Sequence, residues 1–334
     1  MINVSIIIPV YNASKTIART LNSVKNLTFE NYEVIIIDDG SVDDSLSICH
    51  NLTKSDSRYR IKHINNSGVS SARNLGLRLA VGRFVMFLDA DDELPKDSVN
   101  DLYDQAVKSG SQLVMGQYLI RHNGEDVDSN EKLLYGSFKT KDIVDYLVDS
   151  IIFKKTIFGS ACRCLFSKKI LDSYKIEFPK CKLSEDQIFL LDVIFHISKL
   201  TIIEKVVYYY NMEPTSATHE RYKSDFLSDR LIHYESFSKI LEKNELFNNE
   251  RKEEVLSFVI LNSRKQLCFN AALSRKPYKE YFEIKHSVFF ALPIQNKYEE
   301  SWLENQNKND RIVYNMIRYK LFTFLILARK IRNR

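Results

Sequence analysis

The chain has 334 residues, of which 44% are apolar and 27% charged, and it carries a formal net charge of +5 at pH 7. This length and composition predict a folded protein with a sizeable core, built as one large domain or as two unequal ones, and they exclude a disordered chain. The stretch from Arg311 to Arg334 holds seven lysines and arginines and no acid, so the rest of the chain is slightly acidic. Because the net positive charge is confined to this tail and does not extend through the rest of the chain, binding of nucleic acid is the weaker interpretation of the positive charge.

The cysteines and the N-terminal stretch indicate the cellular compartment in which we expect the protein. The five cysteines are an odd number, and Cys162 and Cys164 stand too close together for a zinc knuckle. The opening stretch "MINVSIIIPVYN" has neither the basic segment nor the cleavage site of a secretory signal. We therefore expect reduced thiols and a cytoplasmic protein.

The basic tail contains the apolar run "YKLFTFLILARK", which is shorter than the about 20 residues that a membrane-spanning helix needs. Basic residues beside an aromatic and aliphatic run are typical of a helix that lies in a membrane interface. The alternative is a C-terminal helix that docks on the core of the protein itself. The tail thus predicts either peripheral contact with the inner face of the cytoplasmic membrane or an ordinary packing helix.

Strands and helices are predicted to alternate through the first third of the chain. After the first strand, Ile17, Leu21 and Val24 share one face of a helical pattern, and similar patterns follow the later strands. Continuous apolar strands are typical of an α/β fold in which a mostly parallel sheet has helices on both faces. The predicted strands are Val4–Val10, Tyr32–Ile37, Tyr59–Ile64, Phe84–Leu88 and Gln112–Ile120.

Polar residues follow four of these strands, in the segments Pro9–Asn12, Asp38–Ser41, Asn65–Asn74 and Asp89–Asp92. Each segment alone is explained by turn formation or helix capping. Ligands of α/β sheets bind beyond the carboxyl ends of the strands, so four polar strand ends together predict one binding site.

The motifs that are missing restrict the ligand. The chain has no G-x-G-x-x-G after the first strand and no G-x-x-x-x-G-K-[ST], which excludes a dinucleotide fingerprint and a P-loop. Asp89 and Asp91, two positions apart, can direct oxygens at one Mg²⁺ or Mn²⁺ that bridges to substrate phosphates. Asp38 or Asp39 can accept a hydrogen bond from a base, and Arg73 can neutralise phosphate.

Five segments of the chain resemble the successive motifs of the family 2 glycosyltransferases, which are inverting nucleotide-sugar enzymes with a Rossmann-like GT-A fold. They are "SIIIPVYN", "VIIIDDGSVDDS", "NNSGVSSARNLGL", "GRFVMFLDADD" and "LSEDQIFLL", and the resemblance runs from about Val4 to Tyr210. It implies that Asp89-Ala90-Asp91 is a D-x-D motif that contacts ribose and metal, with Asp91 as the direct ligand of the metal. It also implies nucleotide-binding roles for Pro9, Val10, Asp38, Asp39, Asn66 and Arg73.

Two further carboxylates are candidates for the catalytic base. Glu185 and Asp186 come directly before an apolar helical pattern, where acids are favoured by about 0.3–1 kcal/mol through helix capping alone. In the functional interpretation, one of them deprotonates an acceptor hydroxyl as it attacks the anomeric carbon, and the resemblance places this base at Asp186. One base suffices for an inverting transfer, because a nucleotide leaving group needs no acid.

The segments after these motifs are less informative. The polar stretch Arg121–Ser137 predicts a mobile loop near the acceptor site. In "YYYNMEPTSATHERY", relatives often carry an arginine after the tyrosines, and Asn211 occupies that place. Ser216 and His219 are candidates for contact with phosphate or metal, although a lone histidine in a polar loop is more often only solvated.

The predicted domains are a GT-A catalytic domain at 1–220, a helical region at 221–310 that supports it or forms a homodimer, and the basic aromatic tail at 311–334. The function we expect is transfer of a hexose from a UDP-sugar to a hydroxyl of a growing glycan, either a lipid-linked oligosaccharide of a capsule or cell wall or a sugar attached to a protein. One alternative is a nucleotide-sugar pyrophosphorylase, but "PVYNASKT" lacks its glycine-rich, basic loop. The other is a binding or scaffold module without catalysis.

Overall fold

The structure is a computed structural model that describes residues 2–122, 125–212, 225–292, 294–318, 322–323 and 326. Its contacts divide the chain into two compact units. The first, which we call the sheet unit, comprises Met1–Leu147 and Thr156–Pro214, and the second, the helical unit, comprises Val148–Lys155 and Thr215–Arg334. The predicted boundary between residues 220 and 221 lies outside the described residues and stays a prediction.

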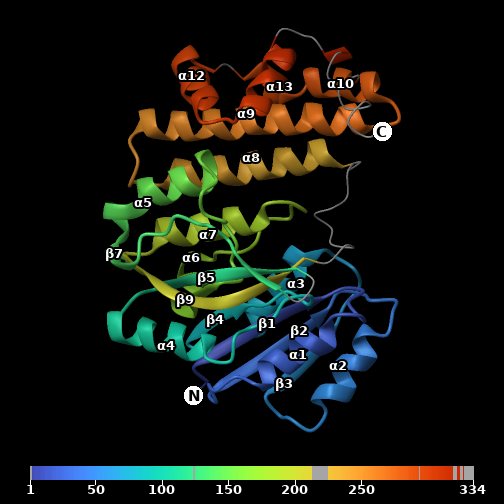
Figure 1. Ribbon diagram of the computed structural model, residues 1–334, viewed down its shortest axis with the longest axis vertical. Coiled ribbons are helices and arrows are strands. Elements are labelled where there is room, and N and C mark those ends of the chain that lie inside the picture. The colour runs from blue at the N-terminus through green and yellow to red at the C-terminus, as the bar shows by residue number, and fades with distance from the viewer. Residues whose placement is uncertain are drawn as a thin grey trace. The chain divides into compact units, whose positions relative to one another are not determined.

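The sheet unit is built on a nine-stranded sheet (Figure 1) in the order β3-β2-β1-β4-β8-β5-β9-β7, with β6 beside β5. β3, β2, β1 and β4 are parallel, and β5 and β9 are parallel to each other. β8 runs antiparallel to both β4 and β5, so the second half of the sheet is mixed. The strands are β1 (Val4–Val10), β2 (Tyr32–Asp38), β3 (Tyr59–His63), β4 (Phe84–Phe87), β5 (Leu113–His122), β6 (Glu125–Asp128), β7 (Gly136–Lys139), β8 (Cys164–Ser167) and β9 (Lys199–Asn211).

Helices cover both faces of this sheet, so the predicted α/β fold is confirmed. α1 contacts α2, and α4 lies against β5, β8 and β9. α3 lies against β1, where a Cβ at Gly76 would overlap the side chain of Ile7. The helices are α1 (Ile17–Lys25), α2 (Ser45–Thr53), α3 (Val69–Leu79), α4 (Ser98–Ser109), α5 (Thr140–Val148), α6 (Lys168–Tyr174) and α7 (Glu185–His196). A π-helical turn, η1 (Asp149–Phe153), follows α5 and belongs to the helical unit.

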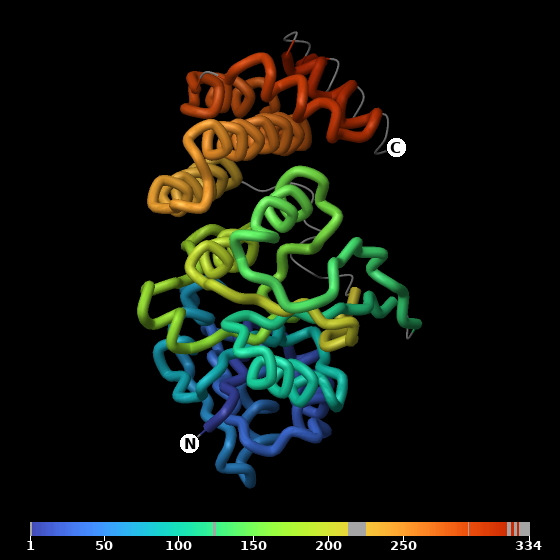
Figure 2. The backbone as a smooth tube through the Cα atoms, turned by 90° about the vertical axis from the view of Figure 1, so that its left-hand side faces the viewer, coloured from blue at the N-terminus to red at the C-terminus, as the bar shows by residue number. Residues whose placement is uncertain are grey.

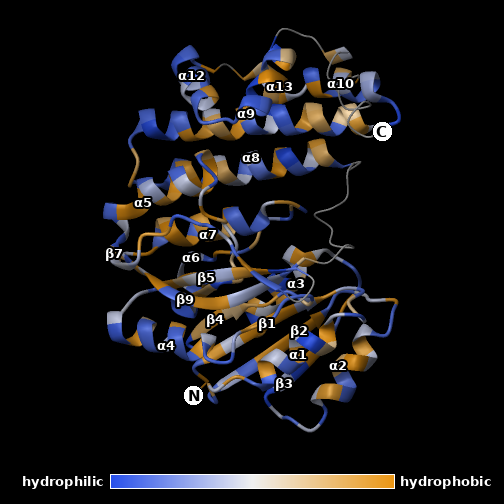
Figure 3. Cartoon of the chain, in the orientation of Figure 1, coloured by the Kyte–Doolittle hydropathy of each residue, from blue (hydrophilic) through white to orange (hydrophobic). Residues whose placement is uncertain are grey.

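The core of the sheet unit follows from the apolar strands. Every residue of β1, β2 and β4 is buried, and these strands are hydrophobic along most of their length (Figure 3). The polar residues inside them are paired, as burial requires. Ser5 Oγ, for example, donates to Glu33 at 2.5 Å, and Glu33 also accepts from the N–H of Val81 at 2.8 Å.

The prediction of a loop from Arg121 to Ser137 is wrong at both ends. β5 continues to His122 and pairs with β6, and β7 pairs with β9. All four residues of β6 are exposed, as are three of the four in β7, so these strands have no buried face and no apolar pattern. The ion pair between Arg121 and Asp126, 2.6 Å long, helps to hold β6 against β5.

The helical unit is arranged around the long helix α9 (Asn249–Leu273). Its N-terminus is capped by Asn248, whose side chain accepts a hydrogen bond from the N–H of Arg251 at 2.8 Å. Figure 2 shows the later helices, in red, along one side of α9, in orange. The other helices of the unit are α8 (Phe226–Lys243), α10 (Pro277–Lys285), α11 (Val288–Ala291), α12 (Asn296–Glu304) and α13 (Lys308–Arg318).

The described part of the tail packs into the core of the helical unit. Ile317, Phe322 and Ile326 are buried together with Leu267 and Phe289. For these three residues the structure favours docking on the protein's own core, and membrane contact by the rest of the tail stays a prediction. Within the described ranges, we find no helix with the length and hydropathy that crossing a membrane requires.

Candidate active site

The polar loops after the parallel strands meet at one edge of the sheet. β1 and β2 end together, because Val10 pairs with Asp38 and the N–H of Asp39 donates to the C=O of Val10 at 2.8 Å. β4 lies on the other side of β1, where the N–H of Leu88 donates to the C=O of Ile7 at 3.0 Å. The predicted site residues at these neighbouring strand ends are Pro9, Val10, Asp38, Asp39 and Asp89.

Asp39 holds the start of α3. Its two carboxylate oxygens accept hydrogen bonds from the N–H groups of Ser67 at 2.7 Å and Gly68 at 2.8 Å. A negative charge is favourable here because it faces the unpaired N–H groups at the helix N-terminus. Gly40, at φ +75°, approaches the backbone of Asn66 so closely that a Cβ would lie 2.7 Å from the Asn66 nitrogen. Asn66 therefore lies beside the turn that follows β2.

Asp38 is completely buried, with 0% of its surface exposed. Its Oδ2 accepts a hydrogen bond from Nδ1 of His63 at 2.6 Å, and its Oδ1 has no hydrogen-bond partner among the described side chains and backbone. A buried carboxylate needs such partners, so the His63 contact stabilises the end of β2. Direct contact of Asp38 or Asp39 with a nucleotide base stays a prediction.

Arg73 is the centre of the candidate site. Its side chain is only 3% exposed, and it forms charge-assisted hydrogen bonds to three carboxylates from two parts of the fold. Nη2 donates to Asp89 at 2.8 Å, and Nη1 donates to Glu185 at 2.9 Å and to Asp186 at 2.7 Å. The guanidinium also lies 5.1 Å from the ring centre of Phe178. One buried cation thus joins the end of β4 to the start of α7.

Glu185 and Asp186 form a tightly spaced acidic pair at the N-terminus of α7. Burial, and after it the charge of Asp186, raises the pKa of Glu185 to about 7. Burial also raises the pKa of Asp186, against the opposing effect of Arg73. Asp186 accepts hydrogen bonds from the N–H of Ala161 and from Ser160 Oγ, both at 3.2 Å, in addition to Arg73. Because these bonds favour the ionised form, we assign the negative charge to Asp186 and the proton near neutral pH to Glu185.

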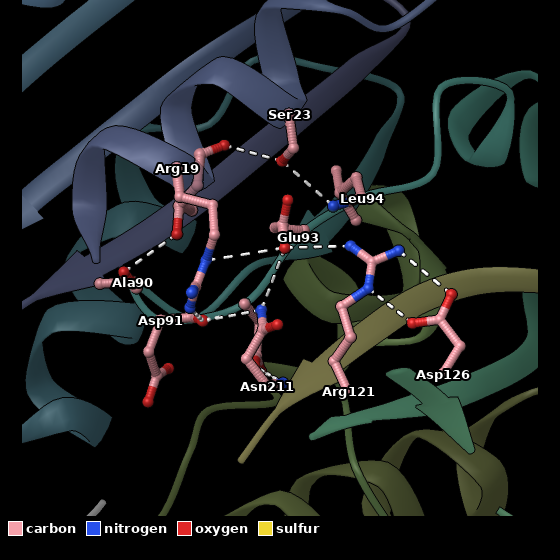
Figure 4. A network of polar contacts seen from close by, with 11 residues as sticks. Arg19, Ser23, Ala90, Asp91, Glu93, Leu94, Arg121, Asp126 and Asn211 are labelled. Carbon is pink, nitrogen blue, oxygen red and sulfur yellow. Dashed lines mark hydrogen bonds and ion pairs between the residues drawn. The ribbon is translucent and has the colours of Figure 1, made fainter. Parts of the chain in front are cut away.

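Side chains from other elements hold the loop that carries Asp89 and Asp91 through hydrogen bonds to its backbone (Figure 4). Arg19 Nη2 donates to the C=O of Asp91 at 2.7 Å, and Asn211 Nδ2 donates to the same oxygen at 3.0 Å. Thr20 Oγ1 donates to the C=O of the neighbouring Ala90 at 3.0 Å. The carboxylate of Asp91 points away from this network in Figure 4. Side chains from α1 and β9 therefore fix the backbone of this loop.

Asp92 is a site residue that the sequence did not reveal. It resembles the start of a turn before Pro95, but it is 1% exposed and accepts hydrogen bonds from Tyr208 Oη at 2.6 Å and from the N–H of Asn211 at 2.8 Å. Burial, and then the charges of Asp91 and Asp89, raise the pKa of Asp92 well above its ordinary value. The sequence did contain one signal for this role, namely three aspartates within four positions, because three carboxylates cannot all ionise easily at such short distances.

Two arginines from distant elements provide positive charge near this acidic loop. Arg121 Nη1 lies 3.1 Å from Glu93, and Arg19 Nε lies 3.6 Å from the same carboxylate. Asn211, where an arginine was expected, donates to Glu93 at 3.4 Å (Figure 4). The sequence did not single out either arginine, because their contacts with Glu93 depend on how α1 and β5 pack near the end of β4.

The donor atoms of the D-x-D motif fit a hard divalent cation. Carboxylate oxygens are what Mg²⁺ and Mn²⁺ prefer, and Mg²⁺ is usually held by one or two protein carboxylates with substrate phosphates and water completing its shell. Asp89 and Asp91 supply such a pair, and the side chain of Asp89 is 33% exposed. Within the ranges that the structure covers there is no cluster of three or more protein ligands. Ser216 and His219 lie outside those ranges.

The parallel strand ends, the D-x-D loop and the buried arginine with its acidic pair are the arrangement expected of an α/β enzyme whose substrate is predicted to bind at the carboxyl edge of the sheet. The family model described as "Glycosyl transferase family 2" matches residues 5–175, about half of the chain. The chain belongs to this family and is a glycosyltransferase, as the motifs predicted.

Individual relatives agree with this assignment. The poly(ribitol-phosphate) beta-N-acetylglucosaminyltransferase TarP of Staphylococcus aureus is 28% identical over 265 residues, which cover 77% of each chain. A crystal structure of S. aureus TarS in complex with UDP-GlcNAc matches 97% of this chain and 90% of its own, with a TM-score of 0.65 and 18% identity. The mannosyltransferase PcManGT of Pyrobaculum calidifontis, in complex with GDP-Man and Mn²⁺, matches 94% of this chain and 86% of its own, with a TM-score of 0.53 and 15% identity. The two structures share the fold, which is the predicted GT-A fold.

Proposed function

We propose that this glycosyltransferase moves a hexose from a UDP-sugar to a hydroxyl of a growing glycan, with inversion and with Asp186 as the general base. The observation that carries the proposal is the Arg73 cluster, in which one guanidinium contacts Asp89 of the D-x-D motif and Asp186 at 2.8 and 2.7 Å. The guanidinium of Arg73 thus joins Asp89, the carboxylate that would face the donor, to Asp186, the carboxylate that would face the acceptor. The nucleotide of the TarS complex, UDP-GlcNAc, supports a UDP-sugar as donor.

In the proposed reaction, Asp186 accepts the proton of the acceptor hydroxyl while the hydroxyl oxygen attacks the anomeric carbon. The bond from that carbon to the diphosphate breaks in the same step, and the nucleoside diphosphate leaves with the bonding electrons. The hydrogen bonds from Ser160 and Ala161 orient the Asp186 carboxylate, which matters because a base acts only at hydrogen-bond distance from its proton. Arg73 stabilises the ionised form of Asp186 before the proton arrives.

Asp89 and Asp91 would hold a bound Mn²⁺ or Mg²⁺, which supplies charge neutralisation for the departing diphosphate. The chain's own part is to orient these two carboxylates, through Arg73 on Asp89 and through Arg19 and Asn211 on the backbone of Asp91. The Mn²⁺ of the PcManGT complex supports a divalent cation in this fold.

The acceptor we propose is a hydroxyl of a growing glycan. The relative TarP is, by its name, an enzyme that acts on poly(ribitol-phosphate), which supports a polymer as the acceptor. A lipid-linked oligosaccharide and a protein-attached sugar remain the two forms to test. Cytoplasmic location, contact of the tail with membrane, and a homodimer formed by the helical region stay predictions.

The proposal is tested with UDP-, GDP- and dTDP-sugars in the presence of Mn²⁺, with release of nucleoside diphosphate as the readout. Asp186→Asn should lower kcat by about 10²–10⁴-fold, which is the usual contribution of a general base. Asp172→Asn is the matched control, because Asp172 pairs with Lys168 on the surface and its side chain is 63% exposed. Turnover that persists in both Asp186→Asn and Asp91→Ala would refute the mechanism. Binding of a nucleotide sugar without any turnover would favour the non-catalytic alternative.

A further inference from the structure

The sheet unit exposes one aromatic ring close to the candidate base. Phe158 is 49% exposed although it lies only two residues before Ser160, which hydrogen-bonds Asp186. Its ring centre is 5.6 Å from that of Tyr118 on β5 and 6.4 Å from that of Tyr210 on β9. We call these three residues the aromatic cluster.

A buried ion pair fixes the backbone of this exposed residue. Arg163 is 1% exposed, and the side chain of its partner Glu131 is 6% exposed. Glu131 accepts a hydrogen bond from the N–H of Phe158, and Arg163 Nη2 donates to the C=O of Phe158 at 2.8 Å. The Arg163 guanidinium also lies 5.3 Å from the ring centre of Tyr118.

Burying two charges costs several kcal/mol per ion unless their attraction and hydrogen bonds offset it. Here, the two charged side chains hydrogen-bond to the main chain of one residue, Phe158, which is itself about half exposed. A scattered surface phenylalanine needs no such support. Side chains that bind a ligand, in contrast, are typically held in place by a supporting layer of hydrogen bonds.

The register of the sheet places the two tyrosines of the aromatic cluster on the same face as Tyr208, which contacts Asp92 of the site. Tyr118 pairs with Tyr208, and Tyr210 follows two residues later on β9. The side chains of Tyr118, Tyr208 and Tyr210 therefore lie on one face of the sheet. Tyr208 on this face reaches Asp92 with its hydroxyl group. In the order of the sheet, β5 and β9 lie beyond β4 and β8, on the opposite side from β1 and β2. The aromatic cluster is therefore on the side of the site away from Asp38 and Asp39, where the nucleotide is predicted.

We propose that the aromatic cluster is a subsite for a sugar ring of the acceptor, with Phe158 as its exposed platform. This inference rests on the proposed transferase function. A pyranose ring gathers its C–H groups on its two faces and its hydroxyl groups at its rim. An aromatic ring packs well against such an apolar face, and tyrosine hydroxyl groups can bond to the rim. Burial and the charge of Glu131 raise the pKa of Tyr118 to about 12, so that this hydroxyl keeps its proton at neutral pH.

The test compares Phe158→Ala with wild type in acceptor saturation curves, once a UDP-sugar is found that the enzyme uses. We expect Phe158→Ala to raise the KM for ring-containing oligosaccharide acceptors about tenfold, in line with the usual strength of aromatic contacts, and to change kcat less. Phe158→Trp should restore a KM near that of wild type, while Phe158→Leu, which keeps an apolar side chain without a ring, should not. Phe282→Ala is the matched control, because Phe282 on α10 is 65% exposed and belongs to the helical unit.

Direct binding of the same oligosaccharides in the presence of UDP gives a second readout that does not depend on turnover. Wild type should bind them and Phe158→Ala should bind about tenfold more weakly. An unchanged KM and unchanged binding in Phe158→Ala, or a wild-type enzyme that uses only an acyclic polyol phosphate, would overturn the inference and leave the transferase proposal standing. Failure of the wild type to use any nucleotide sugar would instead refute the transferase proposal.

Discussion

Replacing Arg73 with methionine should destabilise the sheet unit strongly at pH 7. Methionine preserves much of the volume of the side chain but removes the only described cation that contacts Asp89, Glu185 and Asp186 together. Three hydrogen bonds of 2.7–2.9 Å are lost, and three carboxylates remain crowded in a largely buried site.

The magnitude follows from the burial of the cluster. Removing one partner of a buried ion pair typically costs about 3–5 kcal/mol, because the other charge is left uncompensated. For a unit of this size, such a loss lowers the melting temperature by about 6–20 °C. Arg73 opposes the rise in the pKa values of Glu185 and Asp186, so without it these two pKa values rise further and the folded variant must take up protons at pH 7. Below about pH 4 the carboxylates of the unfolded chain are protonated as well. The difference between variant and wild type in the free energy of unfolding should therefore shrink there.

The assay is thermal or denaturant unfolding of wild type and Arg73→Met between pH 4 and pH 8. Arg78→Met is the matched control, because Arg78 lies on the same helix, is 58% exposed and pairs with an exposed Glu177 at 3.1 Å. Exposed pairs of this kind contribute about 0–1 kcal/mol. The reasoning is refuted if Arg73→Met is no less stable than Arg78→Met, or if its loss of stability is the same at every pH.

Two further predictions concern the acidic groups of the site. Since burial raises the pKa of Glu185 from 4.5 to about 7, its contribution to stability is complete below pH 4.5 and is lost as the pH rises through about 7. Wild type should therefore lose about 3 kcal/mol relative to Glu185→Gln between pH 4.5 and pH 8, measured by denaturant midpoints, and parallel curves would contradict this. Asn211→Ala removes the side-chain hydrogen bond to the C=O of Asp91 and should weaken activation by Mn²⁺ about tenfold with little change in melting temperature. An unchanged Mn²⁺ titration would argue against a positioning role.

The first half of the fold could be predicted because its signals are local. β1, β2 and β4 are continuous apolar runs, and the structure places each of them within one residue of its predicted end. β8 has only four residues, and its place between β4 and β5 depends on how the chain returns to the sheet. No periodicity in the sequence contains that information. β6 and β7 were missed for a different reason, since exposed strands held by backbone pairing carry no apolar pattern.

The candidate site was predictable as a place but not as a network of contacts. The rule that ligands bind at the carboxyl ends of parallel strands predicted one edge of the sheet for Asp39 and Asp89, and β2 and β4 do end at that edge on either side of β1. It could not show that Arg73 turns inward, because Glu185 and Asp186 are 112 and 113 residues away along the chain. The buried role of Asp92 depends in the same way on Tyr208, 116 residues away. Its interpretation as a turn residue was the best that local spacing allowed.

These contacts explain how three aspartates can stand together at the end of β4. Arg73 neutralises Asp89, and burial beside Tyr208 favours the protonated form of Asp92. Arg19 and Asn211 hold the backbone of Asp91 and leave its carboxylate pointing away from their side of the loop. Asp89 is therefore paired with a cation, the protonated form of Asp92 is favoured, and the carboxylate of Asp91 points away from Arg19 and Asn211. The direct metal contact that we predict for Asp91 is compatible with this arrangement, because its carboxylate does not face the side chains of Arg19 and Asn211.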